Sequence, residues 1–132
     1  MDSLKSNAHW LLRLALATVF IYHGIGKVAG PGGIGGFAEM MNLPYVAALL
    51  VTLAEIGAGL GILAGGFGLP LITRLSGLAI VPVMLGAIAM VHWPRWSFTP
   101  SESHPMGGME FQVVLLLIGL YFAITGGQQK AY

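Results

Sequence analysis

The chain has 132 residues, of which 56% are hydrophobic and only 8% are charged. Soluble domains carry about 25% charged residues, so this composition excludes a water-soluble globular protein and indicates a chain surrounded by lipid. The absence of cysteine excludes disulfides and iron–sulfur clusters within the chain, and a net charge of +1 without a basic cluster excludes a nucleic-acid partner.

The length predicts four membrane-spanning helices and no further domain. A spanning helix needs roughly 20 apolar residues, and four such helices with short connections use nearly all of the 132 residues. The predicted fold is therefore all-α, an integral membrane bundle of four transmembrane helices in one domain over residues 1–132.

The first predicted span covers residues 8–26 and ends at Lys27, before a glycine-rich run at residues 30–36. Six of the seven residues in that run are Gly or Pro, which do not sustain a stable helix. The short apolar segment at residues 37–41 is expected to form an interfacial helix before the chain turns at residues 42–44.

The second predicted span covers residues 45–65 and the third covers residues 71–91, with a tight turn at residues 66–70 between them. Pro70 is well placed to open the third helix. Pro82, in the middle of the third span, predicts a kink or a local widening of the helix.

Residues 92–108 form the longest polar segment, and the fourth predicted span follows at residues 109–125. Lysine and arginine residues predict the orientation, because they are enriched in cytoplasmic loops. Four lie toward the side that holds both termini and two toward the other, so both termini are expected in the cytoplasm. The four are Lys5, Arg13, Arg74 and Lys130, and the two are Lys27 and Arg95.

The second span contains Gly57, Gly61 and Gly65 at a spacing of four residues. This spacing places the three glycines on one helix face, where another backbone can approach closely. The pattern is interpreted as a helix-packing face. A dinucleotide-binding role would need a βαβ unit, for which the sequence has no signal.

Charged side chains at membrane depth are costly, and they usually face the bundle interior and mark function. Glu55 lies ten residues into the second span, which is near the midplane at ~1.5 Å per residue. Arg13 and Arg74 lie near the inner surface on neighbouring helices and are expected to reach toward Glu55. Two interpretations stay open: a structural ion pair that fixes helix rotation, and a polar pocket that binds a ligand or relays protons.

A second polar set is expected where three helices end on the outer side. His23 and Lys27 close the first span, His92 closes the third, and Glu110 opens the fourth. Neither an H-x-x-x-H nor an E-x-x-H spacing occurs, so a metal site or haem ligation is disfavoured. A hydrogen-bonded network that caps the bundle is favoured, ahead of a site in which His and Lys donate to a quinone headgroup.

Six methionines toward this side are interpreted as packing: Met40, Met41, Met84, Met90, Met106 and Met109.

The order and spacing of these elements resemble the DoxX family over residues 10–126. The chain departs from the family at its end, where residues 126–129 lack the usual Arg-Tyr-Ser-like tail. The residues that carry the resemblance are Arg13, Phe20, His23, Gly24, Lys27, Gly30, Pro31, Gly32, Gly33, Phe37, Leu43, Pro44, Glu55, Gly59, Thr73, Arg74, His92, Gly108, Met109 and Glu110.

The resemblance implies a four-helix protein of a bacterial or archaeal cell (inner) membrane. Relatives in the family include the large subunit of an archaeal thiosulfate:quinone oxidoreductase, and others are membrane parts of oxidoreductase assemblies. The recurring polar positions of the family fall on Arg13, His23, Lys27, Glu55, Arg74, His92 and Glu110.

Three functions follow from these observations, in descending order. The first is a membrane subunit of an oxidoreductase system that interacts with the quinone pool, with quinone as the candidate cofactor. The second is a structural or accessory subunit of a larger membrane complex, without catalysis of its own. The third is a small-solute carrier with Glu55 as the coupling group.

The expected partners are the lipid bilayer and either other membrane subunits or further copies of the chain. Whether the chain is itself an enzyme stays open.

Overall fold

The computed structural model describes residues 2–127, which fold into helices without a strand. This confirms the all-α prediction. Residues 128–132, which include Lys130 of the orientation prediction and the end of the departing tail, lie outside the described residues.

Three helical segments are long and apolar enough to cross a membrane. They are Lys5–Ala29, Tyr45–Gly65 and Pro70–His92, and they make the chain a helical membrane protein. The last helix, α6 (Glu110–Thr125), has 16 residues. At ~1.5 Å per residue it is about 24 Å long, shorter than a hydrocarbon core of about 30 Å. The structure thus has three full-length spans and one shorter apolar helix in place of the four predicted spans.

The first long helix extends beyond its predicted end. After the short α1 (Asp2–Asn7), α2 runs over His9–Ala29 and carries Lys27 inside its last turn. The next helix, α3 (Gly33–Met40), begins within the glycine-rich run. The prediction that the whole run is non-helical was therefore wrong for its second half. Gly32 supplies the reversal with a φ of 73°, a left-handed conformation that favours glycine.

The two central helices begin where the sequence places them. α4 covers Tyr45–Gly65, and α5 (Pro70–Ala87) begins at Pro70 and continues through Pro82. The widening expected near Pro82 occurs about two to three turns later, in the π-helical segment η1 (Ile88–His92). There the Trp93 N–H donates to the Ile88 carbonyl over 2.8 Å.

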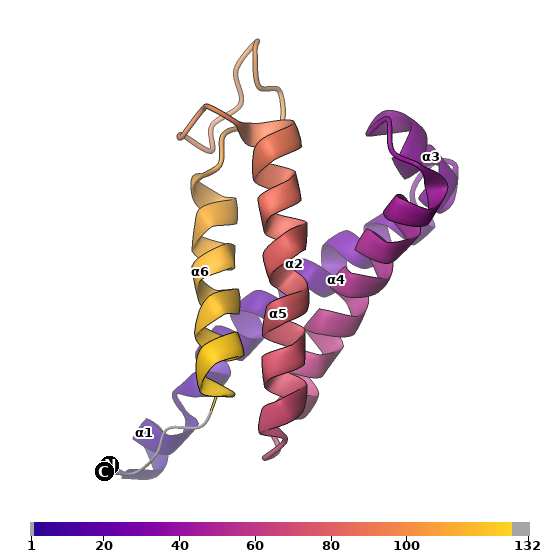
Figure 1. Ribbon diagram of the computed structural model, residues 1–132. Coiled ribbons are helices and arrows are strands. Elements are labelled where there is room, and N and C mark those ends of the chain that lie inside the picture. Colours follow the sequence, from indigo (N-terminus) through magenta and orange to yellow (C-terminus); the bar gives the residue numbers. More distant parts are fainter. Residues whose placement is uncertain (1, 128–132) are drawn as a thin grey trace.

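The long helices form two pairs, α2 with α4 and α5 with α6, which are joined by contacts between α4 and α5. The pairs converge at the end that holds α1, the turn at residues 66–69 and the close of α6, here called the terminal end. They diverge at the end that holds α3 and the loop at residues 93–108, here called the loop end (Figure 1). The buried core between them includes Leu16, Phe20, Ala58, Ile62, Ile80, Met84, Leu115 and Phe122.

Glycines allow close contact within each pair. A Cβ added at Gly77 would lie 2.5 Å from the Gly119 carbonyl oxygen and 2.6 Å from the Ala123 nitrogen, so the backbones of α5 and α6 touch. A Cβ added at Gly59 would lie 2.6 Å from Cγ1 of Ile21 and 3.2 Å from its nitrogen. Both pairs therefore use small residues at their closest approach, as membrane helices commonly do.

The glycine face predicted on the second span is divided by the structure. Gly61 and Gly65 lie against Ser76 and Thr73 of α5. A Cβ added at Gly57, in contrast, would meet no atom of residues 2–127 within 4 Å. The face therefore does not serve a single helix contact, in keeping with the divergence of α4 and α5 toward the loop end (Figure 1).

Candidate functional site

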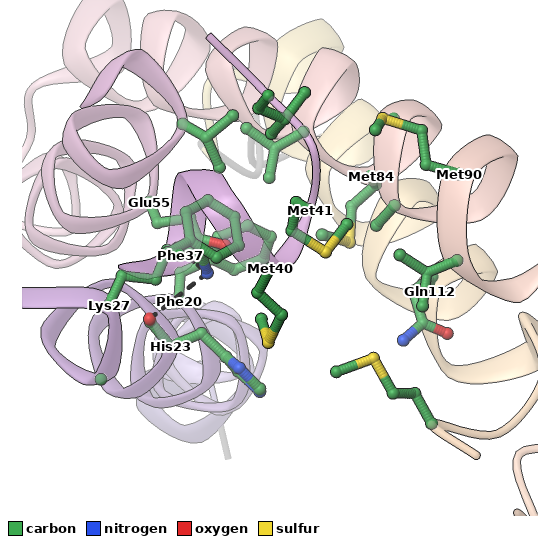
Figure 2. A pocket seen from close by; sticks show the side chains of 18 of the residues that line it. Phe20, His23, Lys27, Phe37, Met40, Met41, Glu55, Met84, Met90 and Gln112 are labelled. Carbon is green, nitrogen blue, oxygen red and sulfur yellow. Dashed lines mark hydrogen bonds and ion pairs between the residues drawn. The ribbon is translucent and has the colours of Figure 1, made fainter. Parts of the chain in front are cut away.

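A cavity of about 810 Å³ lies between the two helix pairs near the loop end, where the pairs diverge. Its walls come from α2, α3, α4, α5, η1 and α6, and they are mostly apolar. This volume falls within the roughly 300–1,000 Å³ that is typical of small-molecule sites. Figure 2 shows side chains from both helix pairs facing the same space.

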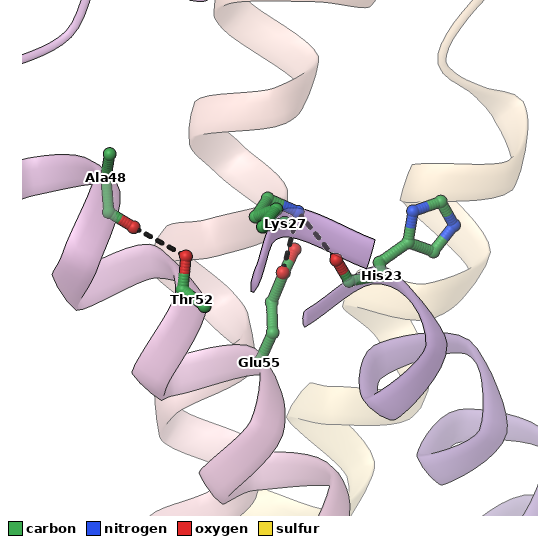
Figure 3. Close-up of polar contacts among 5 residues, drawn as sticks. All are labelled: His23, Lys27, Ala48, Thr52 and Glu55. Carbon is green, nitrogen blue, oxygen red and sulfur yellow. Dashed lines mark hydrogen bonds and ion pairs between the residues drawn. The ribbon is translucent and has the colours of Figure 1, made fainter. Parts of the chain in front are cut away.

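One wall of the cavity carries a buried ion pair. Lys27 Nζ of α2 lies 2.7 Å from Glu55 Oε2 of α4, and their side chains are only 14% and 6% exposed. Lys27 also donates to the His23 carbonyl over 3.4 Å (Figure 3) and lies 4.8 Å from the centre of the Phe37 ring. Each charge of the pair offsets the cost of burying the other.

The partner of Glu55 differs from the expectation that Arg13 or Arg74 would reach it. Gly24 packs against Glu55 and Ile56, so the following turn of α2 carries Lys27 over Glu55. Arg13 lies eleven residues before Gly24, about 16 Å further along the helix. The expectation was wrong because the point at which α2 crosses α4 determines which residues of the two helices lie opposite each other. Lys27 lies opposite Glu55, and Arg13 does not.

Arg13 instead forms a polar cluster near the terminal end. It is 1% exposed, and its guanidinium donates to the Ile62 carbonyl, to Thr73 Oγ1 over 3.1 Å and to His9 Nδ1 over 3.0 Å. It also lies 4.9 Å from the centre of the Phe122 ring. These groups belong to α2, α4, α5 and α6, so a single side chain ties all four long helices together.

Arg74 stands at the same end but is exposed at the start of α5. Its Nε lies near Gly126, at the close of α6, where an added Cβ would come within 3.1 Å. A positive charge beside the carbonyl end of a helix is favourable because of the helix dipole. Arg74 therefore lies apart from the cavity and from Glu55.

His92 lies on η1 and is held by the loop. It is 7% exposed, and its Nδ1 lies 2.8 Å from the Gly107 carbonyl oxygen. A carbonyl only accepts hydrogen bonds, so Nδ1 of His92 is the donor in this contact. Gly107 has a φ of 81°, and a Cβ there would collide with the Phe98 carbonyl. The glycine thus lets the loop fold close enough to receive His92.

The four residues predicted to gather on the outer side are not all in one place. His23, Lys27 and His92 line the cavity, together with Glu55. Glu110 lines a separate groove beside Trp96. Within residues 2–127, no three His, Asp or Glu side chains lie close enough together to hold a metal ion.

Sequence reasoning missed two features of the cavity. Gln112 of α6 lines it, and within the described part of the chain the buried Oε1 atom of Gln112 has no hydrogen-bond partner. The available signal was an amide two residues after Glu110 in an apolar helix. The second feature is that five of the seven methionines line this one cavity, although they were interpreted as packing. These are Met40, Met41, Met84, Met90 and Met106.

The profile of the DoxX family matches residues 8–93, from the start of α2 to the end of η1. The chain is also similar to "Putative oxidoreductase CatD" of Bacillus subtilis (strain 168), with 29% identity over 118 residues that cover 89% of this chain and 78% of that protein. No solved structure matches the chain. The matched segment contains the Lys27–Glu55 pair and His92, and the chain belongs to the DoxX family.

Proposed function

We propose that the chain is a membrane component of an oxidoreductase system and that it binds the ring of a membrane quinone in the cavity between the helix pairs. The observation that carries the proposal is the Lys27–Glu55 pair on the wall of a mostly apolar cavity. The name of the Bacillus relative supports the oxidoreductase association. The chain itself brings binding and orientation, and the electrons would pass between the quinone and a partner subunit.

The polar chemistry of the pair suits a carbonyl oxygen. A lysine ammonium has three N–H donors. Lys27 uses one toward Glu55 and one toward the His23 carbonyl, which leaves the third for a ligand. Because the pair is already neutral overall, it donates to a neutral headgroup without adding net charge to the lipid zone.

The test is quinone binding by the intact chain in nanodiscs, with empty nanodiscs subtracted. Copurified quinone is identified by mass spectrometry, and 1,4-naphthoquinone is then titrated while the tryptophan fluorescence is followed. Lys27→Met should weaken binding at least tenfold, whereas Lys5→Met, on an exposed lysine near the terminal end, should leave it unchanged. Absence of saturable binding by the native chain would overturn the proposal.

The finer membrane arrangement also belongs to this proposal. We place α6 as a fourth, shorter span in the cell (inner) membrane, with both termini in the cytoplasm. The exposed Trp93 and Trp96 support a membrane interface at the loop end, since tryptophan favours such interfaces, and the excess of lysine and arginine toward the terminal end supports the cytoplasmic termini. The chain has no native cysteine, so Lys5→Cys and Ser101→Cys can be labelled singly with a membrane-impermeant maleimide. In intact spheroplasts only the cysteine at position 101 should react, and the reverse pattern would refute the orientation.

A second function, an accessory subunit of a larger complex, is favoured by the uncovered face of α4. Gly57 has open space beside it, and the neighbouring Leu50, Leu53 and Leu60 are 60%, 57% and 54% exposed. A helix of a partner subunit or of a second copy could pack there. Gly57→Leu should then impair assembly while leaving quinone binding intact, and loss of binding with assembly intact would exclude this function.

A further inference from the structure

The feature that calls for a ligand is the side chain of Gln112. Its Oε1 atom is buried without a hydrogen-bond partner among residues 2–127, and the residue lines the cavity. Buried polar atoms are nearly always paired in native proteins, so an exception calls for a specific explanation. Figure 2 shows the amide across the cavity from Lys27 and Glu55, on the opposite helix pair.

We infer that Gln112 is the second polar contact for the ligand of this cavity, and that the ligand carries oxygen groups at two opposite ends of an apolar body. The inference rests on the proposed function and deepens it. One end of the ligand meets the Lys27–Glu55 pair on α2 and α4, and the other meets the Gln112 amide on α6.

Both ends of the cavity hold a donor and an acceptor. At one end, Lys27 has a spare N–H and Glu55 uses only Oε2 within the described residues. At the other end, an amide offers one oxygen acceptor and two N–H donors. A ring with two carbonyl groups would accept from Lys27 and from the Gln112 amide nitrogen. The corresponding diol would donate to Glu55 and to Gln112 Oε1. The site therefore suits both forms of such a ring.

The space between these ends suits a flat apolar body. Met40, Met41 and Met84 lie between the ion pair and Gln112 in Figure 2. Methionine is flexible and polarizable, and it makes favourable contacts with aromatic rings. The lining thus adapts to a ring, while orientation comes from the two polar ends.

Three probes of the same size class test the inference: 1,4-naphthoquinone, 1-naphthol and naphthalene, which carry two, one and no oxygen groups. Each is titrated into the intact chain in nanodiscs, with empty nanodiscs subtracted. In the native chain the affinities should fall in that order. In Gln112→Met, the affinity for 1,4-naphthoquinone should fall about three- to tenfold, to that of 1-naphthol, while 1-naphthol itself is unaffected.

A stability measurement separates binding from a structural role. Gln112→Met removes an unpaired polar atom, so the ligand-free unfolding temperature should stay the same or rise. Leu117→Met is the matched control, because Leu117 lies on the same helix and is 59% exposed. It should change neither affinity nor stability. Gln112→Leu provides a second variant if Gln112→Met expresses poorly.

The outcomes distinguish this inference from the proposed function. Unchanged naphthoquinone affinity in Gln112→Met, or equal affinities of the native chain for 1,4-naphthoquinone and 1-naphthol, would overturn the inference. The proposed function would stand in that case, provided that Lys27→Met still weakens binding. A lower unfolding temperature with an equal loss for all three probes would show that Gln112 is structural. If none of the probes binds the native chain, the proposed function itself fails.

Discussion

The terminal end and the loop end of the bundle both contain buried charged side chains, but these side chains are hydrogen-bonded in different ways. At the terminal end, Arg13 donates to a backbone carbonyl, a hydroxyl and an imidazole, at a level where the four helices converge around it. At the loop end, the Lys27–Glu55 pair faces an 810 Å³ cavity and keeps donors and acceptors that no group within residues 2–127 uses. The first arrangement uses its hydrogen bonds to hold helices together, and the second leaves hydrogen-bonding capacity for a ligand.

In this membrane protein, a buried charge is therefore not by itself a sign of function. Ile62, which accepts from Arg13, lies in the last turn of α4, where carbonyls lack helical partners. The C-terminal end of a helix is negative, so it stabilises the guanidinium without a carboxylate. Open space and unused polar atoms distinguish the loop end as the candidate site.

The largest expected effect comes from breaking the cluster at the terminal end. Arg13→Met removes contacts with three other helices and leaves buried polar groups unpaired, so it should lower the free energy of unfolding by about 4 kcal/mol. Denaturant titration in detergent measures this loss. Arg74→Met, which changes an exposed arginine at the same end, should cost less than about 1 kcal/mol. Equal losses in the two variants would contradict the structural role of Arg13.

At the loop end, removing one member of the ion pair should be worse than removing both. Lys27→Met or Glu55→Leu alone leaves an unpaired charge and should cost about 3 kcal/mol of unfolding free energy. The double variant should lie within about 1 kcal/mol of the native chain, because both charges are gone. A double-mutant cycle of unfolding measurements gives the coupling. Additive losses would mean that the pair does not form in the membrane.

The helix contacts can be compared through two glycines. Gly77→Ala places a Cβ against the α6 backbone and should cost about 2 kcal/mol by overpacking. Gly57→Ala adds a Cβ in open space and should be neutral or should stabilise α4 by up to about 1 kcal/mol. Thermal unfolding of both variants in the same detergent checks this order. A reversal would show that α6 does not pack against Gly77 of α5 and that the face of α4 around Gly57 is covered.

The smallest expected effect concerns the attachment of the loop. His92→Phe removes the hydrogen bond to Gly107 and should cost about 1 kcal/mol. Amide hydrogen exchange should become faster in residues 93–108, while α2 and α4 keep their protection. His92→Asn, which retains a short N–H donor, serves as the comparison and should lose less protection. Unchanged exchange in the phenylalanine variant would mean that other contacts hold the loop.

Much of the helical layout follows from local sequence. α4 has the expected bounds, and α5 begins at Pro70, because a proline fits the first turn of a helix and apolar runs of this length prefer to cross lipid. The family membership also follows from the order of residues along the chain. These features depend on spacing, propensity and hydropathy, which are properties of neighbouring residues.

Which polar groups meet depends on the packing of the helices and not on any local pattern. Gly24 sets the level at which α2 crosses α4, and so it pairs Glu55 with Lys27 instead of Arg13. The divergence of the helix pairs places Gln112 on the cavity wall, while Glu110 lines a separate groove. The rotation of each helix and the angle at which two helices cross depend on side-chain packing between segments that are distant in sequence. They therefore cannot be predicted from a local sequence pattern.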